Sequence, residues 1–449
     1  MRVLFTVFAA KPHFYNLVQM AWAFRAAGHE VRIACQPDLS EAITRTGLTA
    51  VPVGDPLHLW KSFQSPADAD GGDNGVVWQR LSGVSEGRAS MLTWNYVLGT
   101  YTIACSMEYE HMAGVSMMDD LVEHCRSWRP DLVVWDALTY VGPVAALACG
   151  AAHARMLFGL DYNGRMWGTY RRLLAERPAE QRDDPVGDWL TGRLARYGLD
   201  YDPATATELM TGQWTIDPTP GWMQLPSELP RVPVRYLPYN GPTSVPDWVR
   251  EPVDRPRVCL SLGLSARDLL GGDQVATDGG AGVTAGDLLA AVAELDIELV
   301  ATFGADSAGL TGSLPANVRA VDFVPLNELL PSCAAAIHHG GFGTVGNVLT
   351  HGVPSVTIPA PWWDEADLGR SIEERGAGIF VDPAGLTADG VRSAVARLLA
   401  EPSFAAAARG VRDELARTPS PAEAVARMEE LTALHRPSGG YRSPEPDLT

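Results

Sequence analysis

A glycine-rich turn between an apolar run and a helical stretch constrains the fold of this chain most strongly. Cys333 to Ile337 has the length and apolar character of a buried strand. Thr344 to His351 has the pattern of a helix that Gly352 and Pro354 bring to an end. A strand, a glycine-rich turn and a helix in this order predict a βα unit of a parallel sheet.

The same turn predicts a binding site for an anion. The first amide groups of a helix have no partner within the helix, and the helix dipole favours negative charge there. Gly341, Phe342 and Gly343 place main-chain groups at this position, Thr344 adds a hydroxyl group, and His339 adds a ring donor. No Gly-Lys-Ser/Thr follows, so the turn is not a Walker A loop. We interpret it as a pyrophosphate-binding turn; the alternative is a turn whose glycines serve only tight packing.

An aromatic and acidic loop follows the next apolar strand. Ser355 to Ile358 has the character of a strand, and Trp362, Trp363, Asp364 and Glu365 come soon after it. In an open parallel sheet, ligands bind beyond the carboxyl ends of the strands. Anion donors followed by carboxylates suit a nucleoside diphosphate joined to a group rich in hydroxyls. The tryptophans would pack on that group or fill the space under the loop.

Length and composition exclude several classes of protein. A chain of 449 residues predicts two or three domains, and its hydrophobic fraction of 46% is ordinary for a globular protein. A net charge of −19 argues against nucleic acid or an anionic membrane as a partner. The six cysteines lack metal-ligand spacing and suit a reducing cytoplasm. The apolar N-terminus meets Lys11 too early for a signal peptide, and we expect no membrane span.

Two polar residues stand at strand ends in the first half of the chain. Residues 2–9 predict a buried strand, followed by a loop with His13 and a helix from 14 to 27. Asp136 ends a predicted strand from 130 to 135, before a helix from 141 to 149. Each residue either faces the crevice at the sheet edge or caps a helix. No GxGxxG motif follows the first strand, so a classical NAD site is unsupported.

The rest of the chain sets the expected domain organisation. Residues 55–114 predict irregular structure of mobile loops and loosely docked helices. These shape a site for a bulky apolar molecule, or their tryptophans only pack locally. Residues 151–160 predict a strand. Proline-rich residues 237–256 predict a linker. The predicted units are therefore a first domain (1–236), this linker, a second domain (257–420), a closing helix (421–435) and a disordered tail (436–449).

Taken together, these features resemble a known family. The stretches that carry the likeness cover nearly the whole chain, and they are Ala21 to Val31, Trp128 to Asp136, Gly212 to Asp217, Pro238 to Pro242 and His338 to Thr344. They are similar to the GT-B glycosyltransferases that attach deoxysugars to bacterial antibiotics, especially the macrolide and anthracycline transferases of actinomycete type. The resemblance implies an α/β fold of two Rossmann-like domains that face each other across a cleft, with the closing helix crossing back to the first domain.

The resemblance also implies roles for single residues. His13 falls on the catalytic histidine and Asp136 on its partner carboxylate. The donor diphosphate is expected to bind the glycine-rich turn and Ser265, which follows the first strand of the second domain. The residues of the turn are His339, Gly341, Phe342, Gly343 and Thr344. The resemblance implies that the sugar contacts Trp363, Asp364 and Glu365 and that the nucleobase contacts the main chain near Val324. Related glucosyltransferases carry Asp-Gln where this chain has Asp364-Glu365, which favours a deoxygenated sugar, with an amino-bearing sugar also compatible.

The implied reaction is an inverting, metal-free transfer from a TDP-deoxysugar to a hydroxyl of a hydrophobic polyketide aglycone. It needs no cofactor, because the TDP-sugar is a co-substrate. The resemblance further suggests an auxiliary partner similar to a haem monooxygenase, while a homodimer stays open. The alternatives are a nucleotide-sugar epimerase on the same fold and a non-catalytic homologue that only binds a nucleotide sugar.

Overall fold

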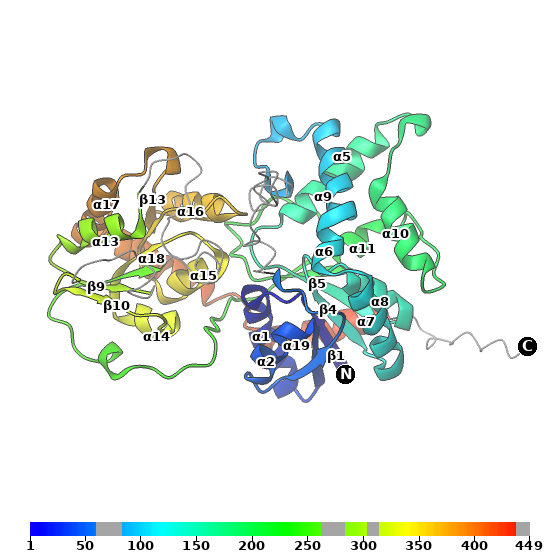
Figure 1. Cartoon of the computed structure of the whole chain (residues 1–449), viewed down its shortest axis with the longest axis horizontal. Coiled ribbons are helices and arrows are strands. Elements are labelled where there is room, and N and C mark those ends of the chain that lie inside the picture. Colours follow the sequence, from blue (N-terminus) through cyan, green and yellow to red (C-terminus); the bar gives the residue numbers. More distant parts are fainter. Residues whose placement is uncertain (60–82, 262–282, 303–313, 437–449) are drawn as a thin grey trace, which may run out of the picture.

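The computed structural model describes residues 1–59, 83–261, 283–302 and 314–436. Within these residues the chain forms two parallel sheets with packed helices, which make two lobes side by side (Figure 1). The α/β fold predicted from the sequence is therefore confirmed.

The first sheet has 7 strands among the described residues, in the order β3-β2-β1-β4-β5-β6-β7. All of its neighbouring strands run parallel. Such strands are buried on both faces, which is why they read as continuous apolar runs in the sequence. Their bounds are β1 (Arg2–Thr6), β2 (Glu30–Cys35), β3 (Thr49–Pro52), β4 (Leu132–Asp136), β5 (Ala152–Met156), β6 (Trp214–Asp217) and β7 (Arg231–Pro233).

The helices of the first lobe cover this sheet and extend into a helical layer at one end of it (Figure 1). Their bounds are α1 (Lys11–Ala26), α2 (Ser40–Thr44), α5 (Trp94–Ile103), α6 (Tyr109–Met112), α7 (Val115–Trp128), α8 (Val141–Cys149), α9 (Tyr162–Ala175), α10 (Pro185–Ala195) and α11 (Ala206–Thr211).

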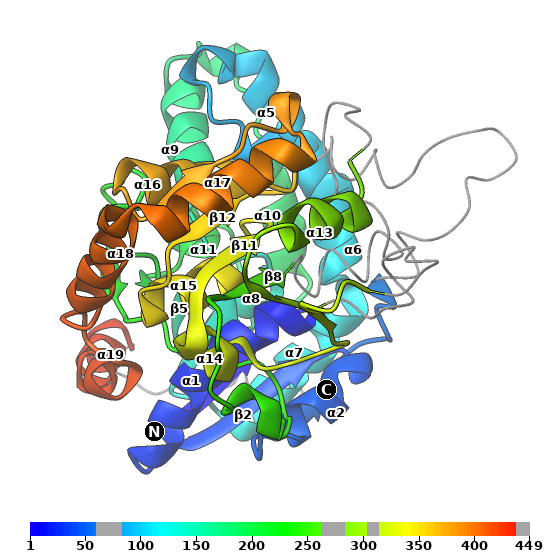
Figure 2. The same cartoon turned by 90° about the vertical axis from the view of Figure 1, so that its left-hand side faces the viewer.

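The second sheet has 6 strands among the described residues, in the order β10-β9-β8-β11-β12-β13, again all parallel. Figure 2 views this lobe from its outer side. Its strands are β8 (Arg257–Ser261), β9 (Glu298–Ala301), β10 (Val318–Ala320), β11 (Cys333–His338), β12 (Ser355–Thr357) and β13 (Gly378–Phe380). Its helices are α13 (Ala285–Ala293), α14 (Leu326–Leu329), α15 (Phe342–His351), α16 (Glu365–Glu374), α17 (Ala388–Ala400) and α18 (Pro402–Leu415).

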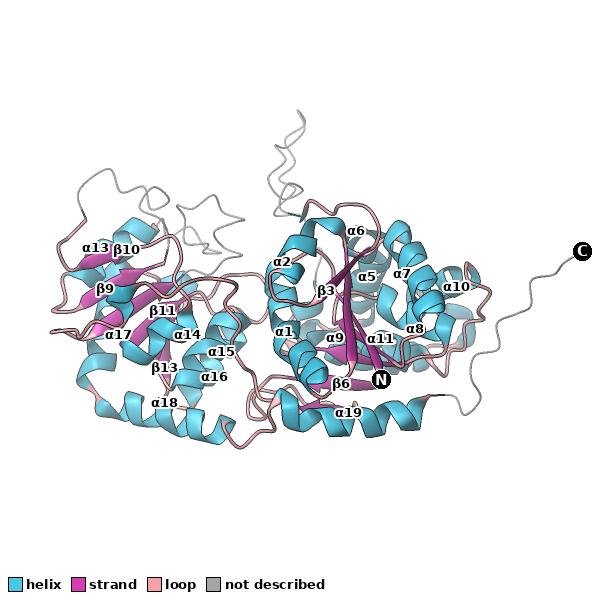
Figure 3. Cartoon of the chain, turned by 90° about the horizontal axis from the view of Figure 1, so that it is seen from below, coloured by secondary structure: helices cyan, strands magenta, loops and turns pink. Residues whose placement is uncertain are grey.

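The last described helix, α19 (Pro421–His435), packs on the first lobe although it follows the second (Figure 3). Ser420 and Glu423 form a capping box at its start. Val425 and Met428 are buried in the same core as Phe14 of α1, and Trp214 Nε1 lies 3.2 Å from Met428 Sδ. This helix therefore ties the two lobes together.

In both sheets the strand order reverses beside the strand that comes first in the chain, and this reversal indicates where a ligand binds. β1 lies between β2 and β4, and β8 lies between β9 and β11. Ligands of such sheets bind in the crevice outside the strand ends at this switch point. His13 follows β1, Asp136 ends β4 and His339 follows β11, so all three lie at switch points of the two sheets.

The structure refines three expectations from the sequence. The sequence predicts irregular structure with loops and loosely docked helices over 55–114. Of this range, residues 60–82 lie outside the described residues, and over 94–112 α5, a π-helical segment (Ala104–Glu108) and α6 form a nearly continuous helix. Aromatic contacts with α9 hold it, such as Tyr101 against Trp167. The strand expected over 151–160 ends at Met156. The expected loop at 11–13 is the first turn of α1, because proline is well suited to that position.

None of the helices within the described ranges combines the length and the apolar character needed to span a bilayer.

Candidate functional site

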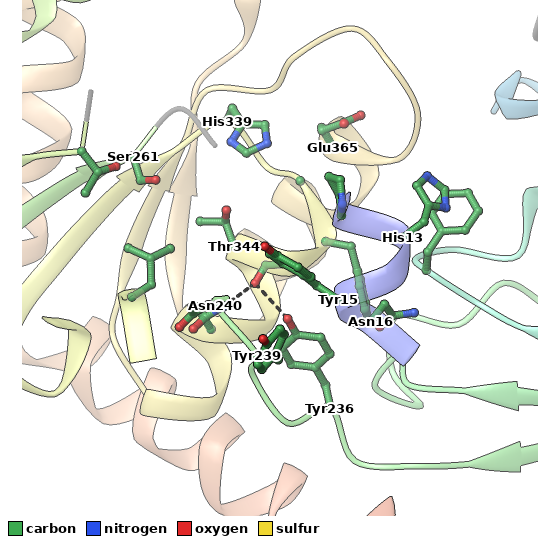
Figure 4. A pocket seen from close by; sticks show the side chains of 18 of the residues that line it. His13, Tyr15, Asn16, Tyr236, Tyr239, Asn240, Ser261, His339, Thr344 and Glu365 are labelled. Atoms are coloured by element: carbon green, nitrogen blue, oxygen red, sulfur yellow. Dashed lines mark hydrogen bonds between the residues drawn. The ribbon is translucent and has the colours of Figure 1, made fainter. Parts of the chain in front are cut away.

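A cavity of about 320 Å³ lies between the two lobes. His13 from the first lobe lines it together with His339, Thr344 and Glu365 from the second (Figure 4). Gly341, Phe342, Gly343, Val324, Trp363 and Asp364 line the same cavity. The structure thus brings together every site residue predicted from the sequence except Ser265, which lies outside the described residues, and Asp136, which lies behind His13.

His13 and Asp136 form a hydrogen-bonded pair at the wall of the cavity. The His13 Nδ1 atom lies 2.9 Å from Asp136 Oδ2, and the Asp136 side chain is fully buried. The other carboxyl oxygen accepts a hydrogen bond from the main-chain N–H of Leu138 at 3.1 Å. A buried carboxylate on Nδ1 fixes the tautomer and leaves Nε2 as the ring nitrogen that can accept a proton.

The His13 ring is also held by two aromatic neighbours. Its centroid lies 4.6 Å from the ring of Phe8 and 4.3 Å from the ring of Phe158. The side chain keeps 18% of its surface exposed. The ring is therefore fixed in orientation but remains open to a molecule in the cavity.

The glycine-rich turn forms the opposite wall. Helix α15 begins at Phe342, and no side chain of the described residues caps its N-terminus. Gly343 is exposed, and Thr344 is partly exposed beside it. The Phe342 ring packs edge-on against that of Tyr236, with the ring centroids 5.4 Å apart. The first turn of α15 therefore presents amide groups and a hydroxyl group to the cavity, as an anion site requires.

The two neighbouring histidines of the turn have different surroundings. His338 is fully buried, and its Nδ1 accepts a hydrogen bond from the Gly340 N–H at 3.1 Å. His339 lines the cavity, and burial lowers its pKa to about 4. His339 is thus neutral near pH 7 and retains one N–H group as a donor. His338 shapes the turn, and His339 faces the site.

The acidic loop lies at one end of the cavity, against the first lobe. Asp364 Oδ2 accepts a hydrogen bond from the Leu160 N–H at 2.7 Å, and Glu365 Oε2 accepts one from the Trp363 N–H at 2.6 Å. Both carboxyl groups are buried, and burial raises the pKa of each, with the neighbouring Glu365 raising that of Asp364 further. The two acids therefore favour the neutral form more than exposed carboxyls do.

Trp363 packs into the interface between the lobes. Its ring lies 5.7 Å from the ring of Phe158 and 5.7 Å from that of Tyr162. The ring of Trp362, in contrast, lies 6.3 Å from that of His339. The two tryptophans thus face different parts of the site.

Several residues that the sequence analysis did not single out complete the cavity. The linker contributes Tyr239 and Asn240, Tyr236 directly precedes the linker, and α15 contributes Asn347. Asn347 Oδ1 is buried without a hydrogen-bond partner in the described part of the chain, while its Nδ2 donates to Gly343 O at 2.7 Å. The stretch Pro238 to Pro242 was part of the family likeness, and that was the available signal for the linker residues.

No group of three or more His, Cys, Asp or Glu side chains suited to hold a metal ion occurs among the described residues. The donors that face the cavity around α15 are the amide groups, Thr344 and His339. Such donors, fixed before the substrate arrives, stabilise negative charge in a partly buried site.

Comparisons with known proteins agree with this arrangement. Residues 22–263 match the family model "Erythromycin biosynthesis protein CIII-like, N-terminal domain", and residues 286–431 match its C-terminal domain. The chain is 48% identical to the aclacinomycin-T 2-deoxy-L-fucose transferase of Streptomyces galilaeus, over 98% of each chain. It is 46% identical to the 10-deoxymethynolide desosaminyltransferase of Streptomyces venezuelae, over 97% of this chain and 98% of that one.

Solved structures show the same similarity. The glycosyltransferase VinC in complex with dTDP superposes with a TM-score of 0.85 at 45% identity, over 97% of this chain and 100% of that one. The spinosyn forosaminyltransferase SpnP superposes with a TM-score of 0.77 at 41% identity, over 96% and 99% of the two chains. The family likeness and the GT-B fold predicted from the sequence are both confirmed. The chain belongs to the erythromycin biosynthesis protein CIII-like family of GT-B antibiotic glycosyltransferases.

Proposed function

We propose that the protein transfers a deoxysugar from a TDP-sugar to a hydroxyl group of a polyketide aglycone, with inversion at the anomeric carbon and without a metal ion. The observation that carries this proposal is that His13, paired with Asp136, lines the same cavity as the α15 N-terminus. The pair can activate a hydroxyl group, and the helix N-terminus can accept a diphosphate. The names of the relatives, among them a deoxyfucose transferase and a desosaminyltransferase, support the class of sugar.

In this mechanism His13 Nε2 removes the proton of the acceptor hydroxyl group. Asp136 stabilises the imidazolium that forms, since its carboxylate is 2.9 Å from Nδ1. The acceptor oxygen then forms a bond to the anomeric carbon as the bond from that carbon to the diphosphate oxygen breaks. Attack from the face opposite the leaving group inverts the anomeric configuration.

The leaving diphosphate takes up negative charge at the α15 N-terminus. The amides of Phe342 and Gly343, the Thr344 hydroxyl and the His339 ring supply the donors, each worth about 3 kcal/mol in favourable sites. This is the basis for the proposed metal independence. We assign the sugar to the end with Trp363, Asp364 and Glu365 and the nucleobase to the end with Val324, which is 2% exposed. Ser265 stays a predicted phosphate contact.

Product analysis tests the proposal directly. The purified chain, alone and together with the proposed auxiliary protein, is incubated with TDP-deoxysugars and a panel of polyketide aglycones, and the anomeric configuration of any product is read by NMR. A product whose anomeric centre is opposite to that of the donor supports inverting transfer. Retention, epimerisation of the donor, or binding without turnover would each contradict it. The relatives named above are transferases, so neither the epimerase nor the non-catalytic alternative is favoured.

Partner and location form a second part of the proposal. An auxiliary protein similar to a haem monooxygenase would contact the α5–α6 region, where Met107 is 45% exposed. Turnover of the purified chain alone is compared with its turnover together with this auxiliary protein, co-expressed with the chain.

All six cysteines are free thiols, which supports a reducing cytoplasm. The oligomeric state is read by light scattering.

A further inference from the structure

Residues 157–162, which join β5 to α9 and include the first residue of that helix, Tyr162, form a segment that contacts two different parts of the proposed site. The ring of Phe158 lies 4.3 Å from that of His13. Two residues later, the Leu160 N–H donates a hydrogen bond to Asp364 Oδ2 of the second lobe at 2.7 Å. One short piece of the first lobe therefore touches both the proposed base and a carboxyl group at the sugar end.

This segment is held firmly in the first lobe. Arg155 is fully buried, and its guanidinium lies 2.6 Å from Asp161 Oδ2. The other oxygen of Asp161 accepts from the Gly164 N–H at the start of α9, and Gly159 O accepts from the Thr219 hydroxyl at 3.0 Å. Breaking a buried ion pair is costly. The segment therefore keeps a fixed position in the first lobe for the residues of the second lobe that pack on it.

At Tyr162 the segment makes a second contact with the other lobe. The Tyr162 hydroxyl donates a hydrogen bond to Asp367 Oδ2 in the first turn of α16. Tyr162 is only 2% exposed and is not among the residues that line the cavity. Asp364 immediately precedes α16, so a contact at Asp367 also fixes the position of Asp364.

The fit between the lobes leaves no room for a side chain at Gly159. A Cβ atom there would lie 2.1 Å from Asp364 Oδ2. Any larger residue would displace the carboxyl group from the Leu160 amide. The glycine is thus required by the close approach of Asp364.

From these contacts we propose that Tyr162 is a positioning residue for the glycosyl transfer. Its hydrogen bond to Asp367 holds α16 against the first lobe, so that the Leu160 amide orients Asp364 at the sugar end of the cavity. This inference rests on the proposed function, because it concerns the distance between the sugar and His13. Misplacement of reacting groups by about 1 Å can lower a rate about a hundredfold.

The first test is Tyr162→Phe, which removes the hydroxyl group and keeps the ring. Its matched control is Tyr170→Phe, because the Tyr170 hydroxyl also donates to a carboxylate, Asp184 Oδ1 at 2.6 Å, but within the first lobe. We expect kcat of Tyr162→Phe to fall about ten- to a hundredfold. The affinity for TDP should stay unchanged, since TDP lacks the sugar. Tyr170→Phe should keep the wild-type kcat.

The second test is Gly159→Ala, with Gly168→Ala as its control. Gly168 lies in α9 with no atom within 4 Å of an added Cβ, so alanine fits there. Gly159→Ala should lower kcat as Tyr162→Phe does, with TDP affinity retained, and Gly168→Ala should have no effect.

Hydrogen exchange of the peptide that covers residues 157–162, followed by mass spectrometry with TDP bound, separates this inference from the proposed function. Faster exchange in Tyr162→Phe, but not in Tyr170→Phe, supports the contact even if the wild-type chain transfers no sugar. Unchanged exchange would overturn the inference. So would a kcat of Tyr162→Phe equal to that of Tyr170→Phe in an active enzyme.

Discussion

The ring of His339 occupies the space that a side chain at position 341 would need. A Cβ atom on Gly341 would lie 2.3 Å from His339 Nε2. The backbone of Gly341, with φ of −59° and ψ of 140°, is open to any residue. The histidine ring, and not the backbone conformation, therefore requires glycine here.

Gly341→Ala should displace His339 and weaken TDP binding while the fold is kept. Loss of a hydrogen bond to a charged group costs about 1.5–3 kcal/mol, or roughly ten- to a hundredfold in affinity. Isothermal titration with TDP measures this. Gly385→Ala, where an added Cβ meets no atom within 4 Å, is the control. Equal TDP affinity in both variants would remove His339 from the proposed diphosphate site.

Asp136→Asn should lower kcat about a hundred- to ten-thousandfold, because the amide no longer stabilises the imidazolium or fixes its tautomer. The TDP affinity should not change, since Asp136 lies behind His13 and is not among the residues that line the cavity. Steady-state kinetics and TDP titration on the same preparation check both statements. A kcat within a few-fold of wild type would show that His13 needs no carboxylate partner.

Glu108 should make the stability of the protein depend on pH. It lies in the π-helical segment, its Oε1 is buried without a hydrogen-bond partner among the described residues, and burial raises its pKa from 4.5 to about 7. Between these values the folded state binds more protons than the unfolded state, so stability falls as pH rises through this window.

Glu108→Gln removes the group that titrates. As the pH rises from 5 to 8, the free energy of unfolding of this variant should therefore gain about 2–3 kcal/mol relative to that of the wild type. Urea denaturation at both pH values measures the difference. A gain that is the same at pH 5 and pH 8 would show that Glu108 does not titrate in this range.

Removal of divalent metal ions should leave turnover unchanged. The proposed charge stabilisation comes from the first turn of α15, Thr344 and His339, which need no ion. Initial rates are compared in EDTA, in buffer alone and in added Mg²⁺. A rate that EDTA abolishes and Mg²⁺ restores would contradict the metal-free mechanism.

Much of the fold followed from local sequence patterns. The helices Val141–Cys149 and Pro421–His435 have the predicted bounds; the first is an apolar run that ends at Gly150, and the second begins at a proline. Loosely docked helices were predicted within 55–114, but the bounds of those at 94–112 were not, since their aromatic side chains pack on α9, far along the chain. The short strands β7 and β13 carry too few residues for a periodic signal.

The candidate site was predictable in part for the same reason. The turn with His339 and Thr344 is a local motif, and strand ends placed His13 and Asp136. Phe158 and Tyr162 gave no local signal, because their importance comes from contacts with His13 and with Asp367 across the lobes. The Asp364 carboxyl was predicted for the sugar, but its contact with the first lobe follows only from how the two lobes meet.

His13→Ala tests the central claim most directly. With a TDP-deoxysugar and an accepted aglycone, we expect kcat to fall at least about a thousandfold, in line with the loss of a general base. The affinity for TDP should equal that of the wild type. Transfer at a rate close to wild type would contradict the assignment of His13 as the base and, with it, the proposed mechanism.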